Sequence, residues 1–255
     1  MSIQVGLSGL SFFVLDTTTN VVLSVINKDF ENTKTPQALL DQLEHAFNNH
    51  DILKSEFSKV QLIHSNNLQT LVPSALFEES ALSDYIKYNT KIFKTDFITY
   101  DVIQNEDIMV VYVPFVNINN YIFERFGSFE YKHSATVLID RVLQLQKNTT
   151  EPHIYININH KHFEITVTEN NLLKLYNSFE YETPEDFIYY VLFTAEQLNM
   201  NPEQFKCILM GKIKESDDLF KLAYKYIRHI SILSYSNMKY HHKQTTEHFT
   251  LLNSL

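Results

Sequence analysis

The same order of predicted elements occurs twice along this chain, and that order limits the fold more than any other feature. In the first copy, alternating apolar residues and runs of β-branched and aromatic residues predict strands at 3–7, 11–15 and 21–26. Thr35-Pro36 predicts the start of a helix, because threonine caps helices and proline suits the first helical position. A fourth strand is predicted at 60–64.

The second copy repeats this order roughly 150 residues later, which is the length of one ordinary domain. Strands are predicted at 154–158, 163–168 and 172–179. Thr183-Pro184 starts the matching helix, and a strand returns at 207–210. We therefore predict an α/β protein of two similar halves that arose by internal duplication. The alternative is one larger α/β domain in which the order of elements coincides.

The predicted halves cover residues 1–147 and 148–236, and residues 237–255 are predicted to be a C-terminal tail. The first half is expected to hold an inserted α+β subdomain at about 66–105. The elements predicted between the two copies are a helix at 73–93, a hairpin of 97–103 and 108–113, a helix at 117–126 ended by Gly127, a strand at 129–132 and a helix at 135–146 capped by Ser134.

Composition excludes several classes of function. The formal net charge of -9 argues against nucleic-acid binding, which needs lysine and arginine to neutralise phosphates. The single cysteine, Cys207, rules out an internal disulfide framework. The longest apolar run, at 108–113, is too short to cross a membrane, and we expect a soluble, cytoplasmic protein. The histidines do not show metal-ligand spacing, so no metal site is predicted.

Three meandering strands, a helix and a strand, used twice, resemble the plan of the actin-like ATPase superfamily, a duplicated fold of the ribonuclease H type. The chain is similar to the branch that contains pilus-assembly and secretion-system actin-like proteins, and to uncharacterised bacterial proteins of the same fold. Residues 59–63, 71–73 and 78–88 resemble the inserted subdomain of that branch. Residues 183–187 resemble the start of its second-half helix.

The resemblance implies two phosphate-binding hairpins, each with an aspartate for magnesium or water and a glycine for close backbone approach. The first would be 5–10, which contains Ser8 and Gly9 but no carboxylate before Asp16. In the second, Asn157 stands where the family has aspartate, and Asn159 where it has glycine. An asparagine side chain carries no charge to hold magnesium.

The resemblance also implies an adenosine-binding strand that ends in paired glycines. Here the segment is 208–212, in which Gly211 is followed by Lys212. Phosphoryl transfer depends on a metal ion and positioned charge, and neither ligand set is visible. We therefore predict no ATP hydrolysis and no required cofactor. Gly9 and Gly211 are predicted to serve turns between packed elements, and residual ATP binding is the alternative.

Two functions from different classes follow. The first is a non-catalytic platform that binds an unidentified protein partner. The second is an ATP-dependent switch or enzyme with a rearranged site. A kinase-like or phosphatase-like hydrolase is a third hypothesis, which the missing metal ligands disfavour. The fold alone does not choose among them, because function depends on the site.

Overall fold

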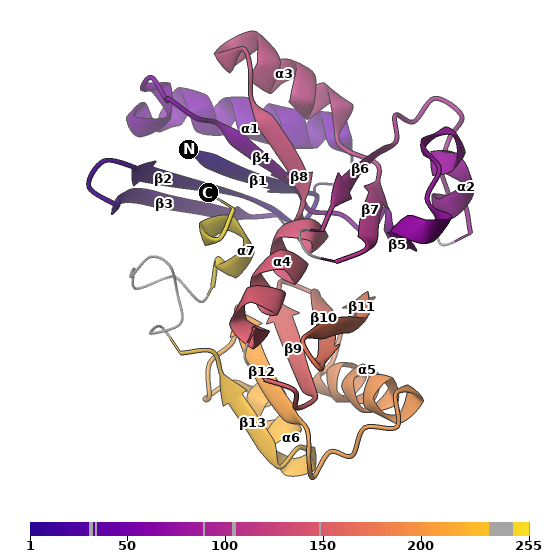
Figure 1. Cartoon of the computed structure of the whole chain (residues 1–255). Helices are drawn as coiled ribbons and strands as arrows, with labels where there is room; N and C mark the ends of the chain where they lie inside the picture. Colours follow the sequence, from indigo (N-terminus) through magenta and orange to yellow (C-terminus); the bar gives the residue numbers. More distant parts are fainter. Residues whose placement is uncertain are drawn as a thin grey trace. The chain divides into compact units, whose positions relative to one another are not determined.

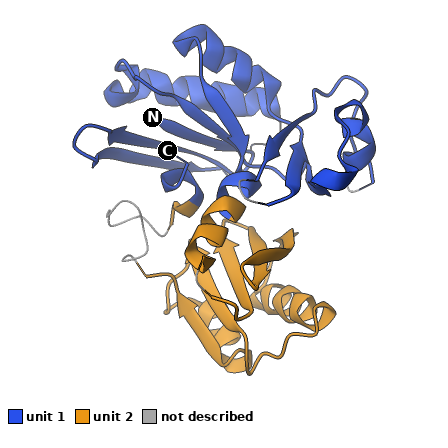
Figure 2. Cartoon of the chain, viewed as in Figure 1, with its two compact units in different colours: residues 1–138, 250–255 blue, residues 139–249 orange. Residues whose placement is uncertain are grey.

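The computed structural model describes residues 1–30, 33, 35–88, 90–103, 106–147, 149–234 and 247–254. The chain forms two compact units, one of residues 1–138 with 250–255 and one of residues 139–249 (Figure 2). The predicted halves, 1–147 and 148–236, differ from these units, because the boundary between the units falls at 138/139, inside a helix, and residues 250–255 belong to unit 1. Part of the predicted tail, 237–246, lies outside the described residues.

The main sheet of unit 1 has the strand order β3-β2-β1-β4-β8 (Figure 1). β1 pairs antiparallel with β2 and parallel with β4, β2 pairs antiparallel with β3, and β4 pairs parallel with β8. One face of this sheet packs against α1 and α3 in an apolar core. These elements are β1 (Ser2–Gly6), β2 (Gly9–Asp16), β3 (Val21–Asp29), α1 (Pro36–Asn49), β4 (Gln61–His64), α3 (Val116–Phe126) and β8 (Glu130–His133).

The sheet of unit 2 has the order β11-β10-β9-β12-β13, with the same parallel and antiparallel pairs at the same places. α5 and α6 cover its apolar face. These elements are β9 (His153–Ile158), β10 (His162–Glu169), β11 (Leu172–Glu180), α5 (Pro184–Gln197), β12 (Lys206–Gly211), α6 (Asp218–Tyr226) and β13 (His229–Ile232).

The two sheets agree in detail as well as in order. The pairing register shifts between Val14 and Leu15 in unit 1 and between Val167 and Thr168 in unit 2. The Thr35 side chain accepts a hydrogen bond from the helix that it caps. Thr183 does the same, and Asp186 completes a capping box with it. The prediction of two similar halves is therefore confirmed.

The inserted subdomain is a three-stranded sheet with the order β5-β7-β6. Its strands are β5 (Gln69–Pro73), β6 (Thr99–Val102) and β7 (Ile108–Tyr112), so the sheet extends beyond the predicted end near residue 105. The predicted hairpin of 97–103 and 108–113 is confirmed, because β6 and β7 pair antiparallel.

The long helix predicted at 73–93 is wrong. That segment contains two 3₁₀ turns, η2 (Ser74–Leu76) and η3 (Glu79–Ala81), and the short helix α2 (Leu82–Ile86). The Tyr85 hydroxyl bonds to the backbone of Leu76 and Glu78, which holds the intervening chain extended. The apolar side of the predicted helix is also divided, because Tyr85 and Ile86 lie on α2 whereas Ile92 lies beyond its end, so these residues do not form one helical face.

The remaining predicted elements are present with small shifts. α3 ends at Gly127, whose φ of 72° suits a glycine at a helix end. α4 (Ser134–Gln146) begins one residue earlier than predicted, and the Ala135 N–H donates to the His133 ring rather than to Ser134. A 3₁₀ turn, η1 (Asp51–Lys54), follows α1, and α7 (Phe249–Leu252) carries buried side chains near the C-terminus. Among the described residues, no helix is long and apolar enough to span a membrane.

A buried polar cluster joins the main and inserted sheets of unit 1. Asp101 accepts hydrogen bonds from the His133 N–H, the Thr136 hydroxyl and the Tyr112 hydroxyl. The His133 ring accepts from the Ala135 N–H at Nδ1, and its Nε2 lies 3.1 Å from the backbone oxygen of Asn66. This arrangement fixes a neutral imidazole with its proton on Nε2.

Candidate functional site

The first predicted hairpin turns tightly and packs against the ends of neighbouring strands. Gly6 pairs with Gly9, so Leu7 and Ser8 form the turn, and the Ser8 carbonyl accepts the Phe30 N–H at 2.9 Å. A Cβ on Gly6 would lie 2.8 Å from the Ser65 backbone oxygen, and one on Gly9 would lie 3.0 Å from that of Lys28. Both glycines are therefore explained by close packing of the chain.

A carboxylate that the sequence analysis missed lies beside this hairpin. Asp29 is the cross-strand partner of Gly9 at the end of β3. Its Oδ1 accepts from the Asn27 amide at 3.3 Å, and the Asn27 oxygen accepts from the Ser11 hydroxyl at 2.6 Å. Asp29 is far from Gly9 in sequence, and only the antiparallel register of β2 and β3 brings the two together.

The second predicted hairpin centres on Glu164, which the sequence analysis did not select. Asn157 and Glu164 are cross-strand partners on β9 and β10, and the Asn157 amide donates to Glu164 Oε2 at 2.8 Å. The Asn159 amide donates to the same oxygen at 3.4 Å. The Tyr176 hydroxyl, from β11, donates to Oε1 at 2.7 Å. Both oxygens of this buried carboxylate are thus engaged by donors of the protein itself.

The alternation of apolar and polar side chains along β10 is the sequence signal from which the position of Glu164 could have been predicted. Phe163 and Ile165 face the apolar core, so Glu164 between them faces the other side of the sheet, as Asn157 does on β9. Tyr176 on β11 lies opposite Thr166, two residues from Glu164 on β10, so its side chain is on the same face of the sheet as Glu164. The pairing of polar side chains across strands predicts this cluster once the register is known.

The chemistry of the cluster is that of hydrogen-bond donors around one carboxylate. Burial raises the pKa of Tyr176 well above its ordinary value, and the charge of Glu164 and their hydrogen bond act in the same direction. Tyr176 therefore keeps its proton and acts only as a donor to Glu164. No group of three or more His, Cys, Asp or Glu suited to hold a metal ion occurs in the part of the chain that the structure describes.

Gly211 lies in the same unit, where β12 ends beside β9. Its φ is +86°, and a Cβ would lie 2.2 Å from the Ile158 oxygen and 2.9 Å from Asn157 Oδ1. The next residue, Lys212, donates its N–H to the Ile158 oxygen at 2.7 Å. Gly211 is thus required by the left-handed backbone and by close contact with β9.

The structure therefore brings Asn157, Asn159, Gly211 and Lys212 together at one end of the unit 2 sheet. Ser8 and Gly9 lie at the first hairpin, in unit 1. The two groups of predicted site residues therefore belong to different units, and the contacts given above for each group lie within its own unit. The parallel strands β9 and β12 both end at this site, and the carboxyl ends of strands are where α/β sheets bind ligands.

Residues 1–230 match the family described as "Protein of unknown function (DUF3822)". The chain belongs to this family. The comparison with curated proteins finds no significant match.

Solved structures show the fold of this DUF3822 chain. A Bacteroides thetaiotaomicron protein with an actin-like ATPase fold and unknown function is 22% identical, with a TM-score of 0.81 over 91% of this chain and 89% of that one. A PilM-PilN type IV pilus biogenesis complex gives 10% identity and a TM-score of 0.65, over 98% and 96%. The ethanolamine utilization protein EutJ from Carboxydothermus hydrogenoformans gives 8% and 0.52, over 99% and 87%. The predicted actin-like ATPase fold is confirmed.

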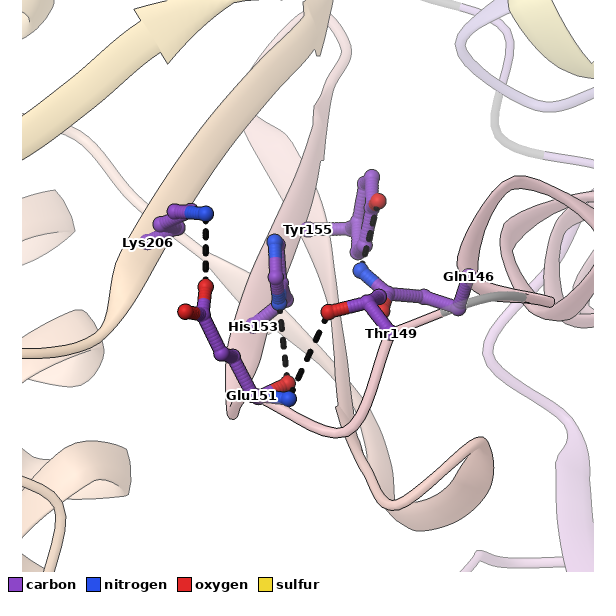
Figure 3. Close-up of polar contacts among 6 residues, drawn as sticks. All are labelled: Gln146, Thr149, Glu151, His153, Tyr155 and Lys206. Carbon is purple, nitrogen blue, oxygen red and sulfur yellow. Dashed lines mark hydrogen bonds and ion pairs between the residues drawn. The ribbon is translucent and has the colours of Figure 1, made fainter.

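This DUF3822 chain has a second polar cluster at the opposite end of β9, and Figure 3 shows its contacts. The Lys206 ammonium lies 2.6 Å from the Glu151 carboxylate, and the His153 ring lies 2.9 Å from the Glu151 backbone oxygen. The Gln146 amide donates to the Tyr155 hydroxyl at 2.8 Å. These contacts fasten the connection between α4 and β9 to the start of the sheet, so we assign them a structural role.

Proposed function

We propose that this chain is a non-catalytic member of the actin-like fold that acts as a protein-binding platform. The observation that carries the proposal is the capture of both Asn157 and Asn159 by the buried carboxylate of Glu164. In the families that this chain resembles, those two positions hold an aspartate and a glycine that serve the nucleotide phosphates.

A carboxylate at this place disfavours phosphate. Two unit negative charges about 4 Å apart repel by roughly 4 kcal/mol at an effective dielectric constant near 20. Within the part of the chain that the structure describes, Glu164 makes no ion pair that would cancel this repulsion. The amide groups of Asn157 and Asn159, which could donate to a phosphate, are already donating to Glu164.

Support for protein binding comes from two other sources. One of the similar solved structures is a PilM-PilN type IV pilus biogenesis complex. In this chain, unit 2 exposes several aromatic side chains, among them Tyr189 at 61% and Tyr224 at 65%. Exposed aromatic residues are enriched at protein interfaces.

One observation favours the alternative, an ATP-dependent switch with a rearranged site. Glu164 supplies a carboxylate next to Asn157, and carboxylates are ligands of magnesium. In that case Glu164 would take over the role of the aspartate that Asn157 replaces.

Thermal unfolding with and without magnesium and ATP separates the two proposals. A ligand that binds only the folded chain raises the melting temperature with its concentration. On the platform proposal the wild type does not respond to ATP, and any response of Glu164→Gln reports the removal of the repelling charge. A shift in wild type that is lost in Glu164→Gln would support the switch, whereas a shift that grows in Glu164→Gln would show that the carboxylate repels nucleotide.

A further inference from the structure

The outward face of α5 carries two stacked aromatic side chains between two acidic ones. We call Glu185, Tyr189, Phe193 and Glu196 the α5 strip, because spacings of four, four and three residues align them along one side of the helix. Tyr189 is 61% exposed and Phe193 is 43% exposed. Their rings lie 5.9 Å apart and nearly parallel, at 17°.

The equivalent helix of unit 1 shows that the fold does not require these aromatic residues. α1 and α5 both follow a capping threonine and begin with proline. When they are aligned on that proline, the four buried positions of α1 are buried on α5 as well, where Ile188 is a fifth: Leu39, Leu43, Ala46 and Phe47 on α1, and Phe187, Val191, Thr194 and Ala195 on α5.

At the positions of the α5 strip, α1 has only polar residues. Asp41 corresponds to Tyr189, and His45 corresponds to Phe193, and both are exposed. The ends of the strip correspond to Gln37 and Asn48. The equivalent face of α1 therefore folds without an aromatic side chain. We infer that the aromatic pair on α5 serves the binding of a partner and not the stability of the helix.

Charge identifies the kind of partner. α5 contains no lysine or arginine, and Glu185 and Glu196 flank the aromatic pair, with Glu182 exposed just before the helix. Neither strip carboxylate makes an ion pair within the described ranges. Asp186 is different, because it is occupied by the capping box.

We propose that the α5 strip is the docking surface for an arginine- or lysine-bearing segment of another protein, an inference that rests on the proposed platform function. Cationic side chains are attracted to the faces of tyrosine and phenylalanine rings and to the flanking carboxylates. A second copy of this chain fits less well, because a two-fold interface would bring one acidic strip against another.

The probe for this surface is a fluorescent, helical alanine peptide with arginine at every fourth position, which matches the spacing of Tyr189 and Phe193. Its citrulline analogue has the same shape without charge. We expect saturable binding of the arginine peptide to the full chain, with amide chemical shifts that change along α5. In the Tyr189→Ala/Phe193→Ala variant affinity falls about tenfold or more, as for interface hot spots. Tyr88→Ala, which removes an 83% exposed tyrosine from unit 1, leaves affinity unchanged.

Three outcomes would overturn the inference. The first is no saturable binding of the arginine peptide, and the second is binding that is equal in wild type and in the double variant. The third is self-association of the chain that the double variant abolishes, which would make a second copy the occupant. None of these measurements depends on ATP. If the docking inference fails, the proposed platform function therefore still stands or falls by the ATP experiment. Conversely, ATP hydrolysis would overturn the platform function without changing the result of the peptide-binding experiment on α5.

Discussion

At the scale of single residues, Glu164 organises the polar side chains of the second hairpin. It is a carboxylate at 6% exposure with three donors within the protein, from Asn157, Asn159 and Tyr176. A buried charge is tolerated only when such donors satisfy it. Asn157 and Asn159 therefore help to satisfy a buried charge of unit 2, which on the platform proposal is their role in place of nucleotide binding.

Replacing Tyr176 by phenylalanine tests this description. The change removes the hydroxyl that donates to Glu164 Oε1 and leaves the buried oxygen with no donor, so we expect a loss of about 1–3 kcal/mol of unfolding free energy. Tyr181→Phe is the matched control, because its hydroxyl donates to a neutral backbone oxygen and should cost about 1 kcal/mol or less. Urea unfolding measures both, and a Tyr176→Phe variant as stable as wild type would contradict the assignment.

The buried histidines of unit 1 predict a pH dependence of stability. Burial lowers the pKa of His64 from 6.5 to about 4 and that of His133 to about 3. The unfolded chain therefore binds more protons than the folded chain at intermediate pH, and stability falls as pH decreases below about 6.5. Asp101 has the opposite sign, because burial raises its pKa.

We expect the two histidines to give a slope of up to about 2 kcal/mol per pH unit between pH 6 and 5. The urea midpoint across this range measures it. His64→Gln should flatten the slope, and His45→Gln on the exposed side of α1 should leave it unchanged. A midpoint that does not move between pH 7 and 5 would show that the buried imidazoles do not control stability.

At the scale of elements, local signals in the sequence predict the helices that begin with Thr-Pro and the strands that alternate. The cap, the proline and the apolar spacing of α1 and α5 act within one turn, so no tertiary information is needed to see them. The prediction for 73–93 failed because the conformation of that segment depends on tertiary hydrogen bonds, such as that from the Tyr85 hydroxyl to the Leu76 carbonyl. The pattern of apolar residues does not contain this information.

The face of α5 can be tested with two substitutions two residues apart. Val191 is fully buried and Tyr189 is largely exposed. Val191→Asp places an unpaired charge in the core, at a cost of several kcal/mol that is comparable to the stability of a domain, so we expect no folded unit 2. Tyr189→Asp reproduces the residue that α1 has at this position and should fold.

Soluble yield and the cooperativity of thermal melting compare the two variants. A Val191→Asp protein that melts cooperatively would mean that the wrong face of α5 has been assigned to the core. Leu192 is as apolar as its neighbour Val191, but it is only partly buried. Which residues of α5 face the core therefore depends on their position around the helix and not on hydrophobicity alone.

At the scale of the whole molecule, the order of elements predicts two similar halves, and the resemblance of that order to the actin-like ATPase superfamily predicts the fold. The site was only partly predictable. The family resemblance points to Asn157, Asn159 and Gly211, but Glu164 and Asp29 depend on cross-strand register. A single sequence does not state which residue of one strand lies opposite which residue of the next.

The most direct test of a non-catalytic chain is the release of phosphate from ATP by the purified full-length protein, with and without magnesium. Magnesium and positioned charge are what phosphoryl transfer requires, and at the second hairpin both asparagines donate to Glu164. We predict release equal to background in both conditions. Magnesium-dependent release that persists through purification, and that falls in Asn157→Ala or Glu164→Gln, would contradict the account and establish the chain as an ATPase.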